Sequence, residues 1–338
     1  MTTDKMPDTT SRSTPTSTST VGSLPSSKED NHWSSLKESG TLTGMRFLVF
    51  MYRTCGRRIF SAVMYPVAIY FVLFRTHQRQ SSLTYFFNHY AYAPQEWSHK
   101  PNWVDVFKHF KAFAEVVLDK LLAWTIDIKE EEFAFTSPTI IDELMNDERG
   151  QLIIGSHFGN LEYCRGFMQR YKSKVINILV YDKHSSNFVE IMQKENQDSR
   201  VNVFQVDEFD ISTMLILQEK ISLGEWVFIA GDRVPLSGLQ HTVDVDFLGE
   251  KAPLPIGPYL LAKALACPVK LMFAYRDQAM DNNIVFDVFP LTDKLTLSRK
   301  NKMADLQVYA QQFADKLQAH CVQAPYQWFN FYSFWHKS

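Results

Sequence analysis

A histidine and a glutamate stand five positions apart in a short segment that contains two glycines. His157 and Glu162 lie in the run GSHFGNLE (155–162), which follows an apolar segment of the kind that forms buried strands. A carboxylate bound to one imidazole nitrogen fixes the tautomer and raises the basicity of the other nitrogen. We therefore predict that the turn folds the His157 ring onto Glu162 and that His157 is a general base. The simpler interpretation is that His157 only makes a hydrogen bond across the loop.

The same segment indicates what this base would act on. Asn160 is a suitable N-cap for the following helix, whose free N–H groups can hold an anion or a developing oxyanion. Gly155 and Gly159 would let the backbone approach a substrate closely. No G-x-S-x-G nucleophile motif is present here, and Ser156 lies in the wrong frame for one. We therefore expect direct attack by an external hydroxyl whose proton passes to the base.

Two later segments add candidate binding residues. The segment WVFIAGDRVPL (226–236) predicts a strand that ends at Asp232 and Arg233. Arg233 suits a phosphate or carboxylate, and Asp232 either pairs with it or reaches the site itself; a surface turn with an ion pair is the alternative. The segment FLGEKAPLPIGPYLLA (247–262) predicts a constrained loop that contains Gly249 and leads into a helix. The start of that helix is another candidate anion site, with plain stiffening of the loop as the alternative.

Short apolar runs alternate with amphipathic segments from residue 150 onward, which predicts an α/β fold with a mostly parallel central sheet flanked by helices. An additional strand over 284–289 would suit an edge of that sheet. The predicted strands are 151–155, 175–180, 201–206, 226–230 and 269–274. The predicted helices are 101–124, 161–171, 187–196, 211–222, 257–265 and 297–318.

The formal net charge of −2 conceals a basic N-terminal segment. No acidic residue occurs between Glu38 and Glu96, whereas six arginines do, so this stretch carries +6 and the rest of the chain sums to −8. Its uncharged run 59–74 would form a helix about 24 Å long, short of a hydrocarbon core of roughly 30 Å, and Pro66 would kink it. This run is either a buried core helix or a membrane helix that spans the bilayer or lies in its interface. The missing acids favour contact with an anionic lipid surface.

We predict three regions: a disordered Ser/Thr-rich tail over 1–30, a membrane-associated helical segment over 31–100 and an α/β domain over 101–338. The near-neutral total charge argues against a nucleic-acid partner. Four separated cysteines argue against a disulfide framework and a Cys-rich zinc site, and we see no cluster of metal ligands. Aromatic residues make up 14% of the chain and gather near 65–92 and 326–335, where we expect contact with lipid; packing in the core is the alternative.

Four motifs in this order resemble a known family. His157-x4-Glu162 resembles the HX4(D/E) motif of the lysophospholipid acyltransferase-like superfamily, in the lipid A late acyltransferase branch that uses Glu. Gly231-Asp232-Arg233 is similar to the second, acidic block of that branch, and FLGEKAPLPIG (247–257) is similar to its FFG-x2-A-x2-P-x-G block. Pro268-Val269 resembles the final, proline-containing strand of that branch. His32-Trp33 and PYQWFNFY (325–332) are similar to an uncharacterised bacterial subgroup of predicted acyltransferases.

The resemblance implies a glycerolipid acyltransferase-like fold and O-acyl transfer, of a fatty or related polyene acyl group, without metal or cofactor. The donor would be acyl carrier protein (acyl-ACP) or, as second choice, acyl-CoA. The acceptor would be a membrane lipid, at the bacterial inner membrane with the active site facing the cytoplasm. Phe247-Leu248-Gly249 replaces the F-P-x-G block typical of glycerolipid enzymes, which weakens the case for a glycerol-phosphate acceptor.

We therefore expect His157 and Glu162 to be catalytic. The expected substrate-binding residues are Asn160, Asp232, Arg233 and Gly249. Two alternatives stay open. One is an acyl-thioester hydrolase that uses the same residues on water. The other is a non-catalytic membrane adaptor that binds lipid.

Overall fold

The computed structural model describes residues 42–125, 133–164, 174–180, 200–205, 211–234, 241–277 and 283–335. The predicted tail over 1–30 and the predicted helix over 187–196 lie outside these residues. Of the predicted helix over 161–171, only residues 161–164 are described.

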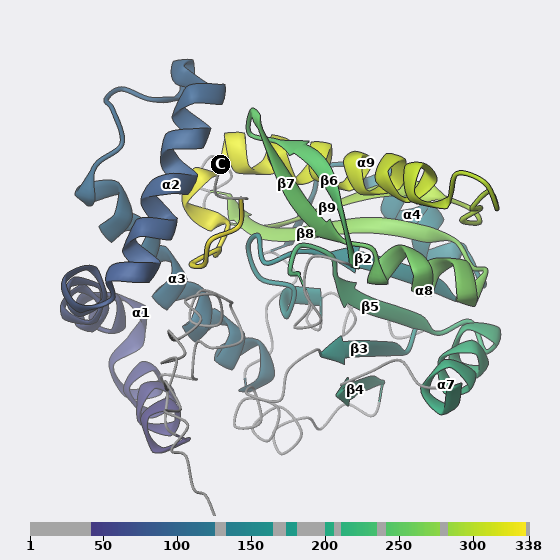
Figure 1. Ribbon diagram of the computed structural model, residues 1–338. Coiled ribbons are helices and arrows are strands. Elements are labelled where there is room, and N and C mark those ends of the chain that lie inside the picture. The colour runs from purple at the N-terminus through teal and green to yellow at the C-terminus, as the bar shows by residue number, and fades with distance from the viewer. Residues whose placement is uncertain are drawn as a thin grey trace, which may run out of the picture.

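The central sheet confirms the predicted architecture (Figure 1). Within the described residues the strand order is β1–β9–β8–β2–β5–β3–β4, and every neighbouring pair except β8–β9 is parallel. Because β1 pairs outside β9, the strand predicted over 284–289 lies next to the edge of the sheet and not at it. The strands are β1 Phe133–Phe135, β2 Gln151–Gly155, β3 Ile176–Val180, β4 Val201–Gln205, β5 Trp226–Ala230, β8 Val269–Asp277 and β9 Asn283–Thr292.

The loop predicted over 247–262 is largely an antiparallel hairpin, so that prediction is wrong in its first half. Strand β6 (Thr242–Phe247) pairs with β7 (Glu250–Pro255) in a separate two-stranded sheet. Leu248 (φ 52°) and Gly249 (φ 82°) form the turn between them, and two successive positive φ angles are typical of tight hairpin turns. The prolines had indicated a loop, but a two-stranded ribbon tolerates proline at positions that need no ladder N–H.

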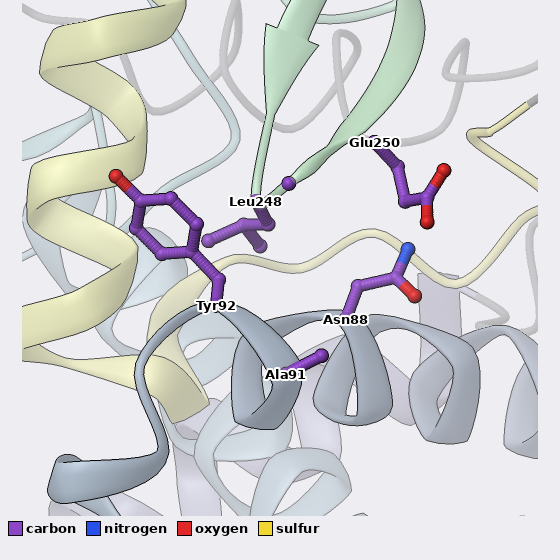
Figure 2. Close-up of a pocket in the computed structure, with 6 residues that line it drawn as sticks. Asn88, Ala91, Tyr92, Leu248 and Glu250 are labelled. Atoms are coloured by element: carbon purple, nitrogen blue, oxygen red, sulfur yellow. The ribbon is translucent and has the colours of Figure 1, made fainter.

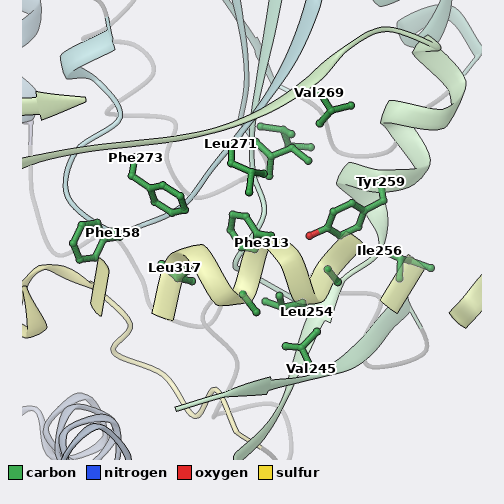
Figure 3. Close-up of a cluster of buried hydrophobic side chains, with 14 of the residues drawn as sticks. Phe158, Val245, Leu254, Ile256, Tyr259, Val269, Leu271, Phe273, Phe313 and Leu317 are labelled. Atoms are coloured by element: carbon green, nitrogen blue, oxygen red, sulfur yellow. The ribbon is translucent and has the colours of Figure 1, made fainter. Parts of the chain in front are cut away.

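Apolar side chains cover both faces of the sheet. Leu152 and Ile154 of β2 point into the larger core, which α8 (Gly257–Leu265), α9 (Lys302–Gln323) and the β6–β7 hairpin cover, whereas Ile153 points into a second core under α4 (Pro138–Asn146). Successive residues of a strand face opposite sides, so this alternation buries the sheet in the middle of the fold. Figure 3 shows Phe273 and Leu271 of β8 against Phe313 of α9 in the larger core.

Three N-terminal helices form a layer beside the sheet, with the C-terminal segment between α2 and the strands (Figure 1). They are α1 (Leu42–Phe74), α2 (Thr76–Tyr92) and α3 (Trp103–Thr125); a short turn, η2 (Pro94–Glu96), lies between α2 and α3. Met64, Ala68 and Val72 of α1 repeat every four residues and pack against α3. The helical φ and ψ angles of α1 are interrupted at Gly56 (φ 73°), and Pro66 lies inside the helix. Among the described residues, no helix has the length and apolar character needed to cross a bilayer.

The remaining helices fit their predictions within a few residues. Helix α7 covers Ile211–Ser222, and α9 begins and ends about five residues later than predicted because Ser298 and Asn301 form a polar turn before it. The turn η6 (Pro325–Gln327) follows α9 and begins the C-terminal segment, residues 325–335.

A buried carboxylate joins the helical layer to the sheet. Asp119 of α3 accepts hydrogen bonds from the Tyr163 hydroxyl (2.6 Å) and from Nε of Arg276 at the end of β8 (2.9 Å). Its side chain is 4% exposed, so bulk water does not replace these donors at the carboxylate, while the Arg276 side chain is 17% exposed.

We expect Asp119→Ala to lower the free energy of unfolding by about 3–5 kcal/mol, because it leaves Arg276 as a partly buried charge without its carboxylate. Urea titrations followed by circular dichroism measure this value. The matched control is Asp246→Ala, which breaks an exposed pair with Lys251 and should cost at most about 1 kcal/mol. Equal losses in both variants would contradict the assigned role of Asp119.

Candidate active site

Two neighbouring parallel strands end side by side and bring the site together. Gly155 at the end of β2 pairs in register with Ala230 at the end of β5, and the Gly231 N–H donates to the Gly155 carbonyl at 2.9 Å. The residues that follow these ends are His157 and Asp232. The sequence predicted both at the carboxyl edge of the sheet, and the strand order makes that edge common to the two.

Asp232 binds His157 through both of its carboxylate oxygens. His157 Nδ1 lies 2.8 Å from Oδ1, and the His157 backbone N–H donates to Oδ2 at 2.8 Å. An ionised carboxylate only accepts hydrogen bonds, so Nδ1 carries the proton and Nε2 presents its lone pair. Within the described part of the chain, Nε2 has no hydrogen-bond partner, and the His157 side chain is 29% exposed. This arrangement makes Nε2 available as a base.

The electrostatics keep the carboxylate charged and the imidazole neutral. Burial alone would raise the pKa of Asp232, but its contacts with His157 and the charge of Arg233 outweigh burial and hold that pKa below its usual value. Burial lowers the pKa of His157, and the Arg233 charge lowers it further against the opposing effect of Asp232. At neutral pH the pair is therefore imidazole and carboxylate.

The carboxylate expected to bind His157 was Glu162, and the structure gives His157 a different one. Glu162 Oε1 lies 3.3 Å from Nζ of Lys120 on α3, and its backbone N–H donates to Asn160 Oδ1 at 3.1 Å. The second contact is a local turn in which the Asn160 side chain binds the backbone two residues further on. The Glu162 side chain lies toward α3, whereas the His157 ring binds Asp232 after β5. No His157–Glu162 hydrogen bond occurs among the described residues.

The glycine of the turn serves the fold and not a ligand. Gly159 has φ 66°, and a Cβ at this position would lie 2.1 Å from the Ala274 carbonyl oxygen of β8. Asn160 N–H donates to that same oxygen at 2.7 Å. The close approach predicted toward a substrate is therefore an approach to the neighbouring strand. Asn160 itself is 1% exposed, and its Nδ2 has no partner within the described residues.

The other predicted binding residues lie in two places. The charge of Arg233 affects the pKa of both His157 and Asp232, so it belongs to the site. Gly249 lies elsewhere: with Asn88, Tyr92 and Glu250 it lines a pocket of about 280 Å³ between α2 and the hairpin turn (Figure 2). The aromatic residues Phe247 and Trp328, in contact at 5.0 Å, lie between this turn and Asp232.

The C-terminal segment contributes contacts that sequence reasoning missed. Trp328 Nε1–H donates to Asp232 Oδ2 at 3.1 Å, and the Tyr332 hydroxyl donates to the Asp232 carbonyl at 3.2 Å. The Phe329 N–H donates to the His157 carbonyl at 3.1 Å. The expectation that residues 326–335 face lipid is wrong for most of them, because Trp328, Phe329, Phe331, Tyr332 and Phe334 are all buried. The only signal was their density in aromatic residues, which fits core packing equally well.

No group of three or more potential metal-ligating His, Cys, Asp or Glu side chains is found in the described ranges. Asp232 accepts hydrogen bonds from the His157 ring, the His157 backbone and the Trp328 indole, whereas Asn160 Nδ2 and His157 Nε2 have no partner among the described residues. The arrangement can take a proton at Nε2, hold the resulting imidazolium against Asp232 and return the proton.

A comparison with models of known protein families covers most of the chain. The family model described as bacterial lipid A biosynthesis acyltransferase matches residues 35–337. No curated protein matches the chain.

The paired geometry predicts the protonation of His157. We expect a pKa below the usual value of about 6.5 in the wild type, and a still lower pKa in Asp232→Asn, because the carboxylate charge is the main group that favours the imidazolium. Nitrogen-detected NMR titration of the histidine rings measures both values, with His157→Gln to assign the signal. An unchanged or higher pKa in Asp232→Asn would contradict the pairing.

Proposed function

We propose a mechanism from the premise that this chain belongs to the bacterial lipid A biosynthesis acyltransferase family and is therefore an enzyme that transfers an acyl group to a lipid. In our proposal the fatty or related polyene acyl group moves from a thioester to a hydroxyl of a membrane lipid, without metal or cofactor. The observation that supports it most strongly is the His157–Asp232 pair. Asp232 binds Nδ1 of the imidazole, and Nε2 is left available to a substrate. An open base without a nucleophilic side chain suits attack by a hydroxyl of the substrate.

The proposed reaction has two steps. His157 Nε2 takes the proton of the acceptor hydroxyl as its oxygen bonds to the thioester carbonyl carbon, and the carbonyl oxygen becomes an oxyanion. The tetrahedral intermediate then collapses, the carbon–sulfur bond breaks, and the imidazolium gives its proton to the leaving thiolate. Asp232 stabilises the imidazolium between the steps because its charge lies 2.8 Å from Nδ1.

Three further residues receive proposed binding roles. Asn160 Nδ2 is a buried donor without a partner among the described residues, next to His157, and we propose that it meets an oxygen of the substrate. Arg233 would hold an acidic part of the donor or acceptor, since its charge reaches His157. Gly249 would contact a part of the substrate remote from the reacting bond, at the pocket in Figure 2.

Glu162 keeps a place in the proposal, with a changed role. We expected it to orient the imidazole, and Asp232 occupies that position. Glu162 instead binds Lys120, a cation whose charge also lowers the pKa of His157. We propose that Glu162 limits this effect and keeps Lys120 at the border of the site. Substitutions of Asp232 and of Glu162 should therefore affect activity to different extents.

We expect Asp232→Asn to lower kcat by about 10⁴-fold, because the wrong tautomer of His157 becomes accessible, and Glu162→Gln to lower it by about tenfold or less. His157→Ala should lose the same activity as Asp232→Asn or more. The assay measures transfer of labelled acyl groups to extracted bacterial lipid, with acyl-ACP in one arm and acyl-CoA in the other. We expect acyl-ACP to be the better donor.

The same assay separates the alternatives. Fatty acid release without an acceptor would identify a hydrolase. Lipid binding without turnover, unchanged by His157→Ala, would identify an adaptor. A loss in Glu162→Gln as large as the loss in Asp232→Asn would restore Glu162 as the orienting carboxylate.

We propose further that α1 holds the enzyme on the membrane, with the site facing the cytoplasm. One face of α1 packs on α3, and the other exposes apolar side chains that include Ile69, Leu73 and Phe74. Cations stand over aromatic rings at the border of this face: Arg79 lies 4.4 Å from the Trp103 ring centre, and Lys111 lies 5.3 Å from that of Tyr65. Amphipathic aromatic rings beside basic groups are typical of the lipid–water interface.

We expect the pair Ile69→Asp and Leu73→Asp to weaken binding to vesicles more than tenfold, because two apolar side chains no longer enter the interface. Sedimentation with phosphatidylethanolamine vesicles, with and without phosphatidylglycerol, measures it. The matched control is Ile211→Asp with Leu215→Asp, two exposed apolar residues on α7. Equal losses in both pairs, or none in the first, would overturn this orientation.

A further inference from the structure

One oxygen of Asp232 receives a hydrogen bond from outside the catalytic turn. Oδ1 accepts from His157 Nδ1, whereas Oδ2 accepts from the His157 backbone N–H and from the indole Nε1–H of Trp328 at 3.1 Å. Asp232 is 2% exposed, so water does not supply these contacts. A buried carboxylate with three donors has its position and its charge set by each of them.

The indole of Trp328 is itself held on all sides. It has no exposed surface and packs edge-to-face on Tyr85, Phe247 and Phe334, with ring centres 4.9–5.2 Å away. Its isolated strand bridge with Phe158 ties its backbone to the catalytic turn. The direction of the Nε1–H bond is therefore fixed by packing and not by Asp232 alone.

A second histidine fixes the backbone of Trp328 from the helical layer. His109 Nε2 lies 2.9 Å from the Trp328 carbonyl, and His109 Nδ1 lies 2.8 Å from the Ser82 hydroxyl. Burial lowers the pKa of His109 to about 3, so the ring stays neutral. A carbonyl only accepts, so Nε2 carries the proton and Nδ1 accepts from Ser82. The chain of contacts runs from α2 and α3 through Trp328 to Asp232.

We propose that Trp328 is a positioning residue of the acyl-transfer site, whose indole N–H, fixed by α2, α3 and the C-terminal segment, aims the Asp232 carboxylate at His157. This inference rests on the proposed function for its kinetic consequence, but not for its geometry. Trp328 acts through Asp232 and has no hydrogen bond to His157's side chain among the described residues.

The indole N–H also changes the charge that the imidazole experiences, an effect that the packing of the ring does not produce. It draws negative charge toward Oδ2 and away from the imidazole. Without it, the full carboxylate charge faces Nδ1, and the imidazolium becomes easier to form. Among the described residues, Arg233 and Lys120 also affect the pKa of His157, and Tyr332 and Cys321 lie close enough to Asp232 to feel its charge; a substitution at Trp328 removes none of these groups.

The experiment compares Trp328→Phe with Trp335→Phe. Trp335 belongs to the same aromatic cluster, and its Nε1–H donates to the Phe247 carbonyl at 3.3 Å, away from Asp232. We expect Trp328→Phe to lower kcat about tenfold or more with an unchanged KM for the donor, as for a lost hydrogen bond to a charged group. The acid limb of its pH–rate profile and the NMR titration of His157 should both move to higher pH. Trp335→Phe should leave both unchanged.

Two additional measurements keep the test decisive. Replacing Trp328 by benzothienylalanine preserves the ring shape and removes only the N–H. The His157 titration can therefore be measured without the N–H even if Trp328→Phe does not fold. Trp328→Phe added to Asp232→Asn should have no further effect on the His157 titration, since the intermediate group is gone. A His157 titration unmoved in the benzothienylalanine protein, or equally moved in Trp335→Phe or in the double variant, would overturn the proposal.

The readouts also separate this inference from the proposed function. If the wild-type protein transfers no acyl group, the acyltransferase mechanism fails, yet the NMR titration still decides whether Trp328 acts on His157 through Asp232. If transfer occurs and the titration does not respond to loss of the N–H, the mechanism stands and the positioning role of Trp328 is wrong.

Discussion

The buried charge of Asp232 is the constraint on which the rest of the site depends. A carboxylate that is 2% exposed is stable as an anion only where donors replace its water. Two donors come from His157, which lies 75 residues earlier, and a third comes from Trp328, which lies 96 residues later. The carboxylate therefore requires three distant segments to meet, and the C-terminal segment must cross the end of the sheet. The same requirement explains why aromatic residues that resembled a lipid-facing surface are buried.

The sequence predicted the sheet well because its signal is local. Strands β2 and β5 are almost entirely apolar, as expected where both faces are covered, and the polar turns after them mark their ends. The predictions failed where structure depends on partners. The prolines in 247–262 indicated a loop, yet β6 supplies a partner strand. The strand over 284–289 was expected at an edge of the sheet, because its own residues do not indicate that β1 pairs with it on the outer side.

The site shows the same limit more sharply. His157 and Asp232 were predicted from the residue types at strand ends, and the structure brings these two side chains together. The partner of His157 was wrong because nearness in sequence favoured Glu162. Two facts decide otherwise: Glu162 pairs with Lys120 of α3, and the order of β2 beside β5 brings Asp232 to Nδ1. Neither can be read from spacing. The role of Trp328 could not be predicted, because it depends on a hydrogen bond to a residue far away in the sequence.

Helix α3 contacts both the helix proposed to bind the membrane and the residues that surround the proposed active site. Its apolar residues pack against α1, the helix with the exposed apolar face. Its His109 donates a hydrogen bond to the Trp328 carbonyl. Its Asp119 and Lys120 bind Arg276 and Glu162 around the start of the helix after His157. A base acting on a lipid must keep a fixed direction relative to the bilayer, because the acceptor hydroxyl arrives at a depth set by its headgroup. One helix that contacts both the proposed lipid-facing element and Trp328, the neighbour of Asp232, meets that need.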